Sequence, residues 1–337
     1  MPRRAVALFS GGLDSLLAVE TVRKQGIEVV PVWICTCFQK PYVEMVKKGK
    51  DLKQLGAELS ERSGFSITVL SVCKEFFHIM QDPPRGFGKN MNPCIDCKIV
   101  MLKRAKSYMA ETGASFIITG EVLGQRPMSQ NRDTLYVIER EAGAEGIVLR
   151  PLCAHHLEQT VPENEGWVDR EQLFGFRGRG RKPQMALAEG MKIIRYPQPA
   201  GGCLLTEPEF AKRVRDVLEY NTSVDEQTAP LCAAGRHFRI SDTLKLIIGR
   251  DHSENLFLER FRETHTLIIP DGVPGPSGMI AGEFKQEDDK MICCGILARY
   301  ITKAEGEIVF NIYHLSGDTE QVRTESLPEE EVERMRI

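Results

Sequence analysis

The chain has 337 residues, of which 42% are apolar and 27% charged, with a formal net charge of −3. This length and composition predict a globular protein of two domains. They exclude a bilayer-spanning segment and the strongly basic balance of a dedicated nucleic-acid-binding protein. The first apolar segment begins at Ala5, which leaves no room for a cleaved signal peptide, so we expect a cytoplasmic protein without a membrane partner.

Strand and helix signals alternate through the first half of the chain. In order, the predicted elements are a strand at 5–9, a helix at 16–22, a strand at 26–33, a helix at 46–62, a strand at 66–70, a helix at 97–112 and a strand at 115–119. This order predicts an α/β domain with a doubly wound parallel sheet, in which ligands bind beyond the carboxyl ends of the strands.

The pattern loosens between residues 152 and 200, where one helix is predicted at 184–191, and it changes again after about residue 232. Segments 238–248, 266–269, 291–300 and 307–313 are predicted as β structure, and the Pro- and Gly-rich stretch 270–276 as a loop. We therefore expect two domains, residues 1–220 and 232–337, the second smaller and of mixed or mainly β structure.

A glycine turn joins the first strand to the first helix, in the stretch Ser10-Gly11-Gly12-Leu13-Asp14-Ser15. Gly11 and Gly12 let the backbone approach a phosphate, and the first amides of the helix point at it with the helix dipole behind them. The hydroxyls of Ser10 and Ser15 add donors, and Asp14 is expected to bind Mg²⁺ or to orient the helix start. No Gly-Lys-Ser/Thr follows, so this is not a Walker loop.

In this context the hexapeptide resembles the PP-loop of ATP pyrophosphatases, enzymes that cleave ATP between the α and β phosphates and adenylate a substrate. The alternative is an ordinary turn. The resemblance implies an α/β domain that uses ATP and Mg²⁺.

A second block carries a closer resemblance. Residues 119–125 read Thr-Gly-Glu-Val-Leu-Gly-Gln, followed by Met-Ser-Gln at 128–130 and by Leu-Arg-Pro-Leu at 149–152. Over residues 4 to about 205 the chain resembles the pyrophosphatase domain of the tRNA 4-thiouridine synthetase family. The tRNA 2-thiouridine synthetases share the first motif and an Asn-Pro-Cys-x-x-Cys-like element. The 4-thiouridine family usually has an RNA-binding THUMP module before the PP-loop, and some members end in a rhodanese domain. Neither is recognised in this sequence, so we expect RNA capture and sulfur delivery to be solved differently here.

Ten cysteines are many for a cytoplasmic protein. Five lie in apolar segments and are expected to pack as small apolar residues: Cys35, Cys73, Cys153, Cys293 and Cys294.

Three other cysteines are candidate metal ligands. Cys94 and Cys97 stand at a Cys-x-x-Cys spacing at a helix start, and Cys203 lies in the Pro- and Gly-rich stretch 196–206. They resemble the ligand set of iron–sulfur-dependent tRNA thiolases, which implies a [4Fe–4S] cluster with one iron open to hydrosulfide. A disulfide or persulfide pair that uses Cys203 and a zinc or metal-free site are the alternatives.

The remaining motifs each keep two interpretations. The basic run 177–182 either binds RNA phosphates or is a solvated loop, and His155 and His156 are expected at the surface or in packing. In the last domain, residues 248–255 and 274–278 resemble the RNA-binding NFACT-R module, against a packing or dimerisation domain.

Together these motifs predict an ATP-dependent tRNA sulfurtransferase that adenylates a uridine carbonyl oxygen and replaces it with sulfur. The resemblance favours 4-thiouridine at position 8, with 2-thiouridine at position 34 second. The partners are tRNA and a sulfur donor, either sulfide or a persulfide carrier; a homodimer is left open. The alternatives are a PP-loop ligase for a small molecule, a sulfur-removing enzyme and a non-catalytic RNA-binding protein.

The predicted site residues fall into four groups. These are Asp14, Cys94 and Cys203 as catalytic residues; Ser10, Gly11, Gly12, Asp14, Ser15, Gly120 and Gln125 around the nucleotide; Glu121, Gln125 and Gln130 as the polar floor of the cleft; and Cys94, Cys97 and Cys203 as metal ligands.

Overall fold

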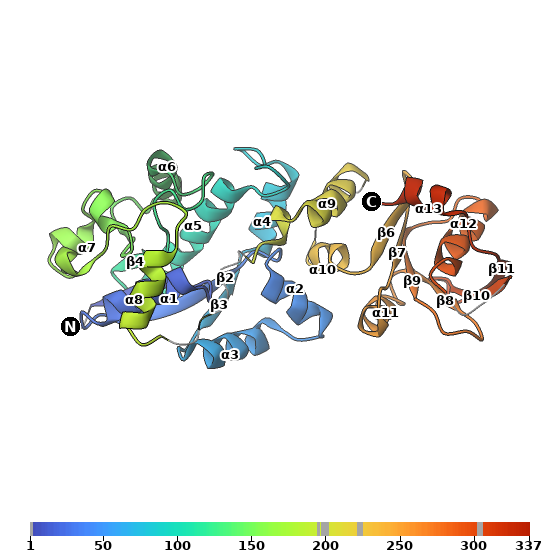
Figure 1. The fold of residues 1–337 in the computed structure, drawn as a ribbon, viewed down its shortest axis with the longest axis horizontal. Helices are drawn as coiled ribbons and strands as arrows, with labels where there is room; N and C mark the ends of the chain where they lie inside the picture. The colour runs from blue at the N-terminus through green and yellow to red at the C-terminus, as the bar shows by residue number, and fades with distance from the viewer. Residues whose placement is uncertain (1–2, 194–195, 197–201, 221–224, 302–305) are drawn as a thin grey trace. The chain divides into compact units, whose positions relative to one another are not determined.

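A computed structural model describes residues 3–193, 196, 202–220, 225–301 and 306–337. The chain divides into two compact units (Figure 1): unit 1 is Met1–Met45 with Lys50–Thr206, and unit 2 is Val46–Gly49 with Glu207–Ile337. The predicted domain limits, 1–220 and 232–337, assign residues 207–220 to the first domain, whereas the structure places them in unit 2. Residues 221–224 lie outside the described part. Those limits stay a proposal.

Unit 1 contains the predicted parallel sheet. Its strands are β1 (Arg4–Leu8), β2 (Glu28–Cys35), β3 (Thr68–Ser71), β4 (Phe116–Thr119) and β5 (Val148–Leu149). They are hydrogen-bonded in the order β3-β2-β1-β4-β5, and every pair is parallel. The order reverses at β1, because β2 and β4 lie on either side of it. The crevice beyond the carboxyl ends of β1 and β4 is therefore the expected ligand site of this fold.

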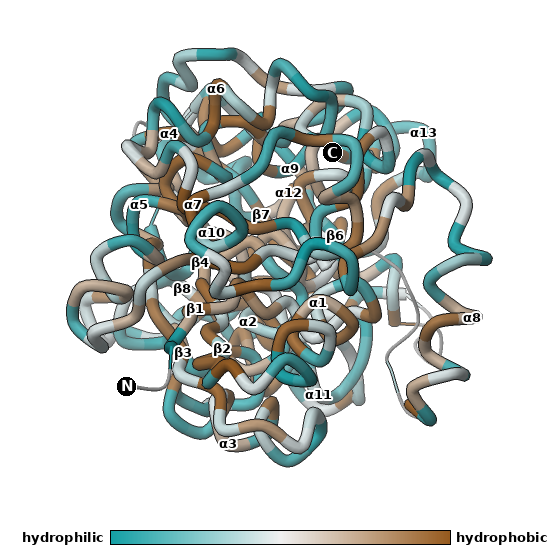
Figure 2. The backbone as a smooth tube through the Cα atoms, turned by 90° about the vertical axis from the view of Figure 1, so that its left-hand side faces the viewer, coloured by the Kyte–Doolittle hydropathy of each residue, from teal (hydrophilic) through white to brown (hydrophobic). Residues whose placement is uncertain are grey.

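Helices cover this sheet on both faces. They are α1 (Leu13–Arg23), α2 (Lys40–Lys47), α3 (Leu52–Ser63), α4 (Cys73–Gln81), α5 (Cys94–Thr112), α6 (Arg132–Ala142), α7 (Val161–Asn164) and α8 (Lys182–Gly190). Leu102 of α5 and Ile138 of α6 pack with Val6 and Ile117 of the strands in one buried cluster, while α1 and α8 lie together on the other side (Figure 1). In Figure 2 the strands β1 and β2 run as hydrophobic segments, as expected for strands buried on both faces.

The single helix predicted over 46–62 is wrong, since the chain forms α2 and α3 with a break between them. Gly49 adopts φ 68°, a left-handed conformation that ends a helix. Asp51 then caps the next helix, because its carboxylate accepts a hydrogen bond from the Gln54 amide at 2.7 Å.

Unit 2 is built on an antiparallel sheet of six strands, in the order β11-β10-β8-β9-β7-β6. The strands are β6 (Arg236–Ser241), β7 (Leu244–Ile248), β8 (Thr266–Pro270), β9 (Gly278–Gly282), β10 (Ile308–Tyr313) and β11 (Thr319–Thr324). The helices are α9 (Pro208–Tyr220), α10 (Thr228–Cys232), α11 (His252–Glu259), α12 (Glu287–Ala298) and α13 (Glu329–Met335). The prediction of a smaller, mixed domain with much β structure is confirmed.

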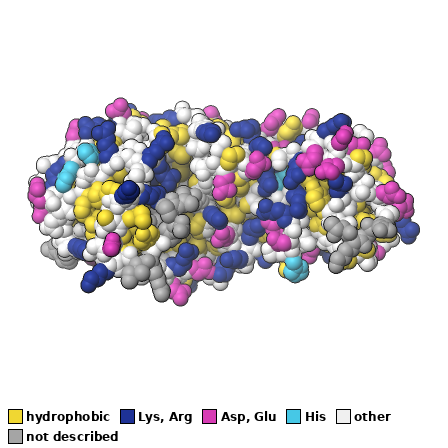
Figure 3. Space-filling view, in the orientation of Figure 1, with side chains coloured by type: hydrophobic (Ala, Val, Ile, Leu, Met, Phe, Trp, Pro, Cys, Tyr) yellow, Lys and Arg dark blue, Asp and Glu magenta, His cyan; other side chains and the backbone are white. Residues whose placement is uncertain are grey.

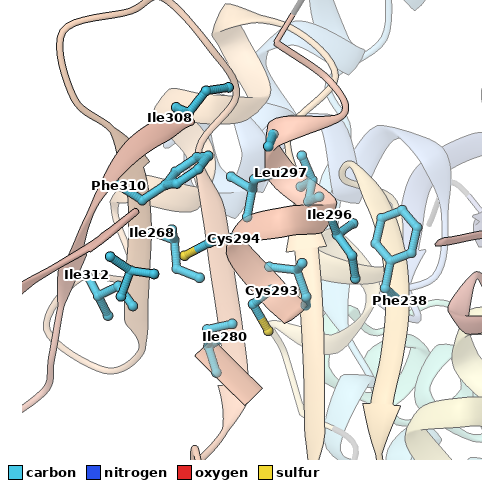
Figure 4. Close-up of a cluster of buried hydrophobic side chains, with 14 of the residues drawn as sticks. Phe238, Ile268, Ile280, Cys293, Cys294, Ile296, Leu297, Ile308, Phe310 and Ile312 are labelled. Atoms are coloured by element: carbon cyan, nitrogen blue, oxygen red, sulfur yellow. The ribbon is translucent and has the colours of Figure 1, made fainter. Parts of the chain in front are cut away.

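The β segment predicted over 291–300 is wrong, because residues 291–298 belong to helix α12. All residues from Cys293 to Ala298 are buried, so this half of the helix shows no polar face from which a helical period could be recognised. Figure 4 shows Cys293 and Cys294 packed among Ile268, Ile280 and the other apolar side chains of this core. These two cysteines pack as small apolar residues, as predicted.

Among the described residues, no helix is both long and apolar enough to cross a bilayer.

The core of unit 2 supplies a test of its stability. Phe310 is fully buried, so Phe310→Ala is expected to lower the free energy of unfolding by about 3–5 kcal/mol, measured by urea unfolding of the full chain. Leu315 is 55% exposed, and Leu315→Ala should change it by less than about 0.5 kcal/mol. Equal effects of the two changes would contradict the assignment of Phe310 to the core.

Candidate active site

The glycine turn between β1 and α1 has the geometry of a phosphate loop. Gly11 adopts φ 75°, and Gly12 is the N-cap of α1 without any side-chain cap. The hydroxyls of the turn hold it closed: Ser15 Oγ donates to the Gly12 carbonyl at 2.8 Å, and Ser10 Oγ lies 3.2 Å from Ser15 Oγ. An uncapped helix N-terminus behind a closed glycine turn is suited to an anion.

Asp14 follows this turn and has one carboxylate oxygen without a partner. Its Oδ2 accepts a hydrogen bond from Gln125 Nε2 at 3.1 Å and lies 4.0 Å from the guanidinium of Arg181. Its Oδ1 is buried and has no hydrogen-bond partner in the described part of the chain. Buried acceptors are nearly always satisfied, and a carboxylate oxygen is a preferred ligand of Mg²⁺, so this oxygen fits a missing cation.

Gly120, directly after β4, touches the backbone of the phosphate loop. A Cβ at this position would lie 2.6 Å from the Asp14 carbonyl carbon and 2.6 Å from the Ser15 amide nitrogen. These are backbone atoms that no rotamer change can move, so only glycine fits. This contact places the loop of residues 120–125 against residues 14–15, and the two predicted nucleotide motifs meet.

Glu121 lies beneath that loop in a buried ion-pair network. It pairs with Lys98 at 3.2 Å and with Arg150 at 3.1 Å, and Arg150 also binds Glu139. Burial alone would raise the pKa of Glu121, but Lys98 and Arg150 outweigh it and lower the pKa to about 2. At neutral pH Glu121 is therefore an ionised anchor of the loop, with its carboxylate turned to these cations.

Gln130, the other residue predicted for the polar floor, is also buried. Its carbonyl accepts the Gly124 amide at 2.7 Å, which closes the loop after β4, and its Oε1 has no partner among the described residues.

Cys94 and Cys97 lie on the first turn of α5, and Cys203 stands on a segment paired with residues 38–40, which follow β2. Cys203 forms an isolated bridge with Gln39, and Leu204 N donates to the Phe38 carbonyl at 2.9 Å. Residues 197–201 of the Pro- and Gly-rich stretch lie outside the described part.

The three sulfurs share one electrostatic neighbourhood. Burial raises the pKa of Cys97, and the thiols of Cys203 and Cys94 raise it further. Among the described residues, however, the three sulfurs do not all lie within 4.8 Å of one another. They are therefore neighbours but not the closed ligand set of a single ion.

The turn that presents Cys94 has polar supports that the motifs did not single out. Arg85 pairs with the buried carboxylate of Asp96 at 2.7 Å, and Asn92 Nδ2 lies 3.2 Å from Cys94 Sγ. An acidic residue inside the Cys-x-x-Cys motif was the only sequence signal for this support.

The basic run 177–182 lies along the loop after β4. Arg177 bridges to Leu123, Gly178 N donates to the Leu123 carbonyl at 2.8 Å, and Arg181 reaches Asp14. His155 and His156 bond through their rings to the backbone carbonyls of Arg170 and Gly175 at 3.0 and 2.8 Å, in agreement with a packing role.

A second group of cysteines lies at the ends of β2 and β3. Cys37 and Cys73 form a disulfide, and Cys35 Sγ lies 3.8 Å from Cys73 Sγ. The prediction that Cys73 merely packs as a small apolar residue is therefore wrong. A Cys-x-Cys spacing at the end of a strand was the missed signal.

The first unit is thus an α/β domain whose glycine turn and helix N-terminus are suited to an anion, and a smaller antiparallel unit follows it in the chain. Comparison with known families agrees. Residues 2–162 match the family model described as "Thiamine biosynthesis protein (ThiI)", and residues 235–336 match the one described as "NFACT protein RNA binding domain". The resemblances drawn from the motifs, to PP-loop enzymes of tRNA thiolation and to the NFACT-R module, are confirmed.

Individual relatives cover part of the chain. It is 30% identical over 158 residues to the "Probable tRNA sulfurtransferase" of Thermococcus kodakarensis, which is 47% of this chain and 39% of that protein. It is 29% identical over 160 residues to the protein of the same name from Thermus thermophilus, which is 48% of this chain and 37% of that protein. A crystal structure titled as a 4-thiouridine synthetase–RNA complex with bound ATP aligns at a TM-score of 0.34 and 20% identity, over 64% of this chain and 50% of that one. The chain thus spans about two fifths of the length of these curated relatives.

The Glu121 network predicts a pH dependence of stability. Its carboxyl has a folded pKa of about 2 against an ordinary value of 4.5, so its contribution is complete above about pH 5.5 and is lost as the pH falls toward 2. At pH 7 Glu121→Gln should lower the free energy of unfolding by about 3 kcal/mol, since one pKa unit corresponds to about 1.4 kcal/mol.

Urea unfolding at pH 7, 5, 4 and 3 checks this prediction. The difference from the wild-type chain should shrink steadily below pH 5. Glu111 pairs with Arg104 at the surface, so Glu111→Gln is the matched control and should cost less than about 1 kcal/mol. A Glu121→Gln difference that stays constant from pH 7 to pH 3 would refute the low pKa.

Proposed function

We propose that the protein is an ATP-dependent tRNA sulfurtransferase, which replaces a uridine carbonyl oxygen with sulfur and makes 4-thiouridine at position 8. The observation that carries the proposal is Asp14. One of its oxygens is bound by Gln125 of the second motif and the other is buried and unsatisfied, directly after an uncapped glycine turn. The partial matches to tRNA sulfurtransferases support the same reaction.

In this proposal the phosphate loop holds the triphosphate of ATP. Ser10, Gly11, Gly12 and Ser15 supply amide and hydroxyl donors at the helix N-terminus, where the dipole favours negative charge. Asp14 Oδ1 would ligate Mg²⁺, which neutralises the phosphates when it is bound. Gly120 and Gln125 complete the nucleotide side of the cleft.

The first step is adenylation of the base. The uridine carbonyl oxygen attacks the α phosphorus, an O–P bond forms, the bond between the α and β phosphates breaks, and pyrophosphate leaves. The loop amides face the developing charge and stabilise it. The carbonyl oxygen, a poor leaving group, becomes part of AMP. Reaching a stacked base in folded tRNA costs a few kcal/mol of unstacking.

In the second step hydrosulfide attacks the activated carbon, and AMP leaves with the former carbonyl oxygen. Where a persulfide carrier is the source, its outer sulfur attacks the carbon, and a second thiol then breaks the sulfur–sulfur bond and leaves as a disulfide with the carrier. Cys94, Cys97 and Cys203 lie in one electrostatic neighbourhood and are the residues that would hold an iron–sulfur cluster, since three cysteine ligands leave one iron of a [4Fe–4S] cluster open. Such a cluster, when bound, supplies an open iron for hydrosulfide. A persulfide or disulfide pair with Cys203 is the alternative.

The RNA partner would be bound in part by unit 2. In Figure 3, Lys and Arg side chains gather on the drawn face around α10 and β6, in the unit that matches the NFACT RNA binding domain. Arg236 stacks over Tyr300 at 4.6 Å, so a cation and an aromatic ring stand together, a combination that RNA-binding surfaces use. A cytoplasmic location and domain limits of 1–220 and 232–337 belong to this proposal.

Mass spectrometry of tRNA nucleosides tests the reaction. Anaerobically purified protein, Mg·ATP, sulfide and unmodified tRNA should yield 4-thiouridine, and Cys203→Ala should reduce it at least 100-fold. The matched control is Cys232→Ala, a buried cysteine of unit 2 whose removal should leave the yield unchanged. Detection of 2-thiouridine in place of 4-thiouridine would overturn the assignment to position 8. Formation of AMP without any thionucleoside would overturn the assignment of tRNA as the substrate.

Arg181 supplies a second test, independent of RNA. Arg181→Ala removes a cation beside Asp14, and we expect the Kd of a Mg·ATP analogue with a non-cleavable α–β bond to rise about tenfold, or about 1.4 kcal/mol. Isothermal titration calorimetry measures it. Arg179→Ala, on the exposed part of the same run, is the control. An unchanged Kd for Arg181→Ala would place Arg181 outside the nucleotide site.

A further inference from the structure

Three buried sulfurs that the proposed reaction does not use converge at the carboxyl edge of the parallel sheet. Cys35 ends β2, Cys37 follows two residues later, and Cys73 begins α4 just after β3. The parallel pairing of β2 with β3, which sets Cys35 opposite Ser71, brings these segments together. The three Sγ atoms all lie within 4.8 Å of one another, and no residue of the group is more than 3% exposed. We call them the Cys35–Cys37–Cys73 triad.

The spacing of the sulfurs matches a tetrahedral metal ion. A zinc–thiolate bond is about 2.3 Å long, so two sulfurs on one tetrahedral ion stand about 3.8 Å apart. Cys35 Sγ and Cys73 Sγ are 3.8 Å apart in the structure. Cys37 and Cys73, joined as a disulfide with a Cα–Cα distance of 5.5 Å, need only the bond between them to be reduced for both to become ligands.

The backbone around Cys37 is shaped to bring its sulfur toward Cys35. In an extended strand, the Cα atoms of residues i and i+2 are about 6.7 Å apart. Cys37 instead adopts φ 64°, a left-handed conformation that costs a non-glycine residue about 1–2 kcal/mol. Gln39 braces this bend: its Oε1 accepts the Thr36 amide at 3.0 Å and its Nε2 donates to the Ile34 carbonyl at 3.0 Å. A strained, braced turn that gathers three thiols indicates a binding site.

We propose that the reduced Cys35–Cys37–Cys73 triad binds one soft divalent metal ion of the zinc class, and that the Cys37–Cys73 disulfide is its oxidised, metal-free state. Interconversion needs a dithiol reductant, which gives two electrons and two protons to the disulfide and becomes a disulfide itself. The three thiols then form three metal–sulfur bonds and release three protons. Three protein ligands leave a fourth position, as in exchangeable rather than closed structural sites.

The triad adjoins the segment that holds Cys203. Phe38, the residue after Cys37, accepts the Leu204 amide at 2.9 Å, and Gln39 bridges to Cys203. A metal ion in the triad would therefore fix residues 38–39, against which the segment of Cys203 is hydrogen-bonded. The site itself does not depend on the proposed reaction.

Titration with Cd²⁺ alone tests the triad. The full chain with Cys94, Cys97 and Cys203 all changed to Ser keeps the triad and removes the neighbouring thiols. After reduction by a phosphine under anaerobic conditions, it should bind one equivalent of Cd²⁺ with a thiolate-to-cadmium charge-transfer band, and adding Cys35→Ser should weaken binding at least 100-fold. No band, or a band that persists unchanged with Cys35→Ser, overturns the proposal.

Alkylation of the otherwise unchanged protein keeps the test valid if the variant does not fold. Cd²⁺ should slow alkylation of Cys35, Cys37 and Cys73 at least tenfold in the reduced protein and leave Cys232, a buried cysteine of unit 2, unaffected. Equal protection of Cys232, or a Cys37–Cys73 disulfide that survives excess reductant, overturns the proposal.

Discussion

The close approach of Gly120 to the phosphate loop is the contact on which the rest of the candidate site depends. With a Cβ only 2.6 Å from the backbone of Asp14 and Ser15, any other residue would push the loop after β4 away from α1. Gln125 would then lose its hydrogen bond to Asp14. The basic run at 177–182 would move together with the loop after β4, because the two are hydrogen-bonded to each other. Because residue 120 has no side chain, two motifs that lie more than 100 residues apart in the sequence can pack against each other.

An ion pair connects the loop after β4 to the helix that carries Cys94 and Cys97. Lys98 lies on α5 one residue after Cys97, and it pairs with Glu121 on the loop after β4. The helix that presents Cys94 and Cys97 and the loop of residues 120–125 are thus fixed to each other by an ion pair whose carboxylate is buried and whose ammonium is partly exposed. Loss of Lys98 would leave Glu121 with Arg150 as its remaining cation.

The sequence specified the parallel sheet and the phosphate loop because their signals are local: an apolar strand, two glycines and a helix start lie within 20 residues. The second half of helix α12 was misassigned because Cys293–Ala298 are all buried and show no amphipathic period. The Cys35–Cys37–Cys73 triad could not be predicted, since Cys73 reaches the other two only through the β2–β3 pairing and the left-handed turn at Cys37. The ion-pair partners of Glu121 were hidden for the same reason, because Lys98 and Arg150 come from other elements.

The central claim is that this cleft binds ATP by its phosphates and cleaves it between the α and β positions. Phosphorus NMR of a mixture of the protein, Mg·ATP, sulfide and unmodified tRNA follows the bond directly. The account predicts that AMP and pyrophosphate appear in equal amounts, and that neither appears with Asp14→Asn. Formation of ADP and inorganic phosphate, or cleavage that persists undiminished in Asp14→Asn, would contradict it.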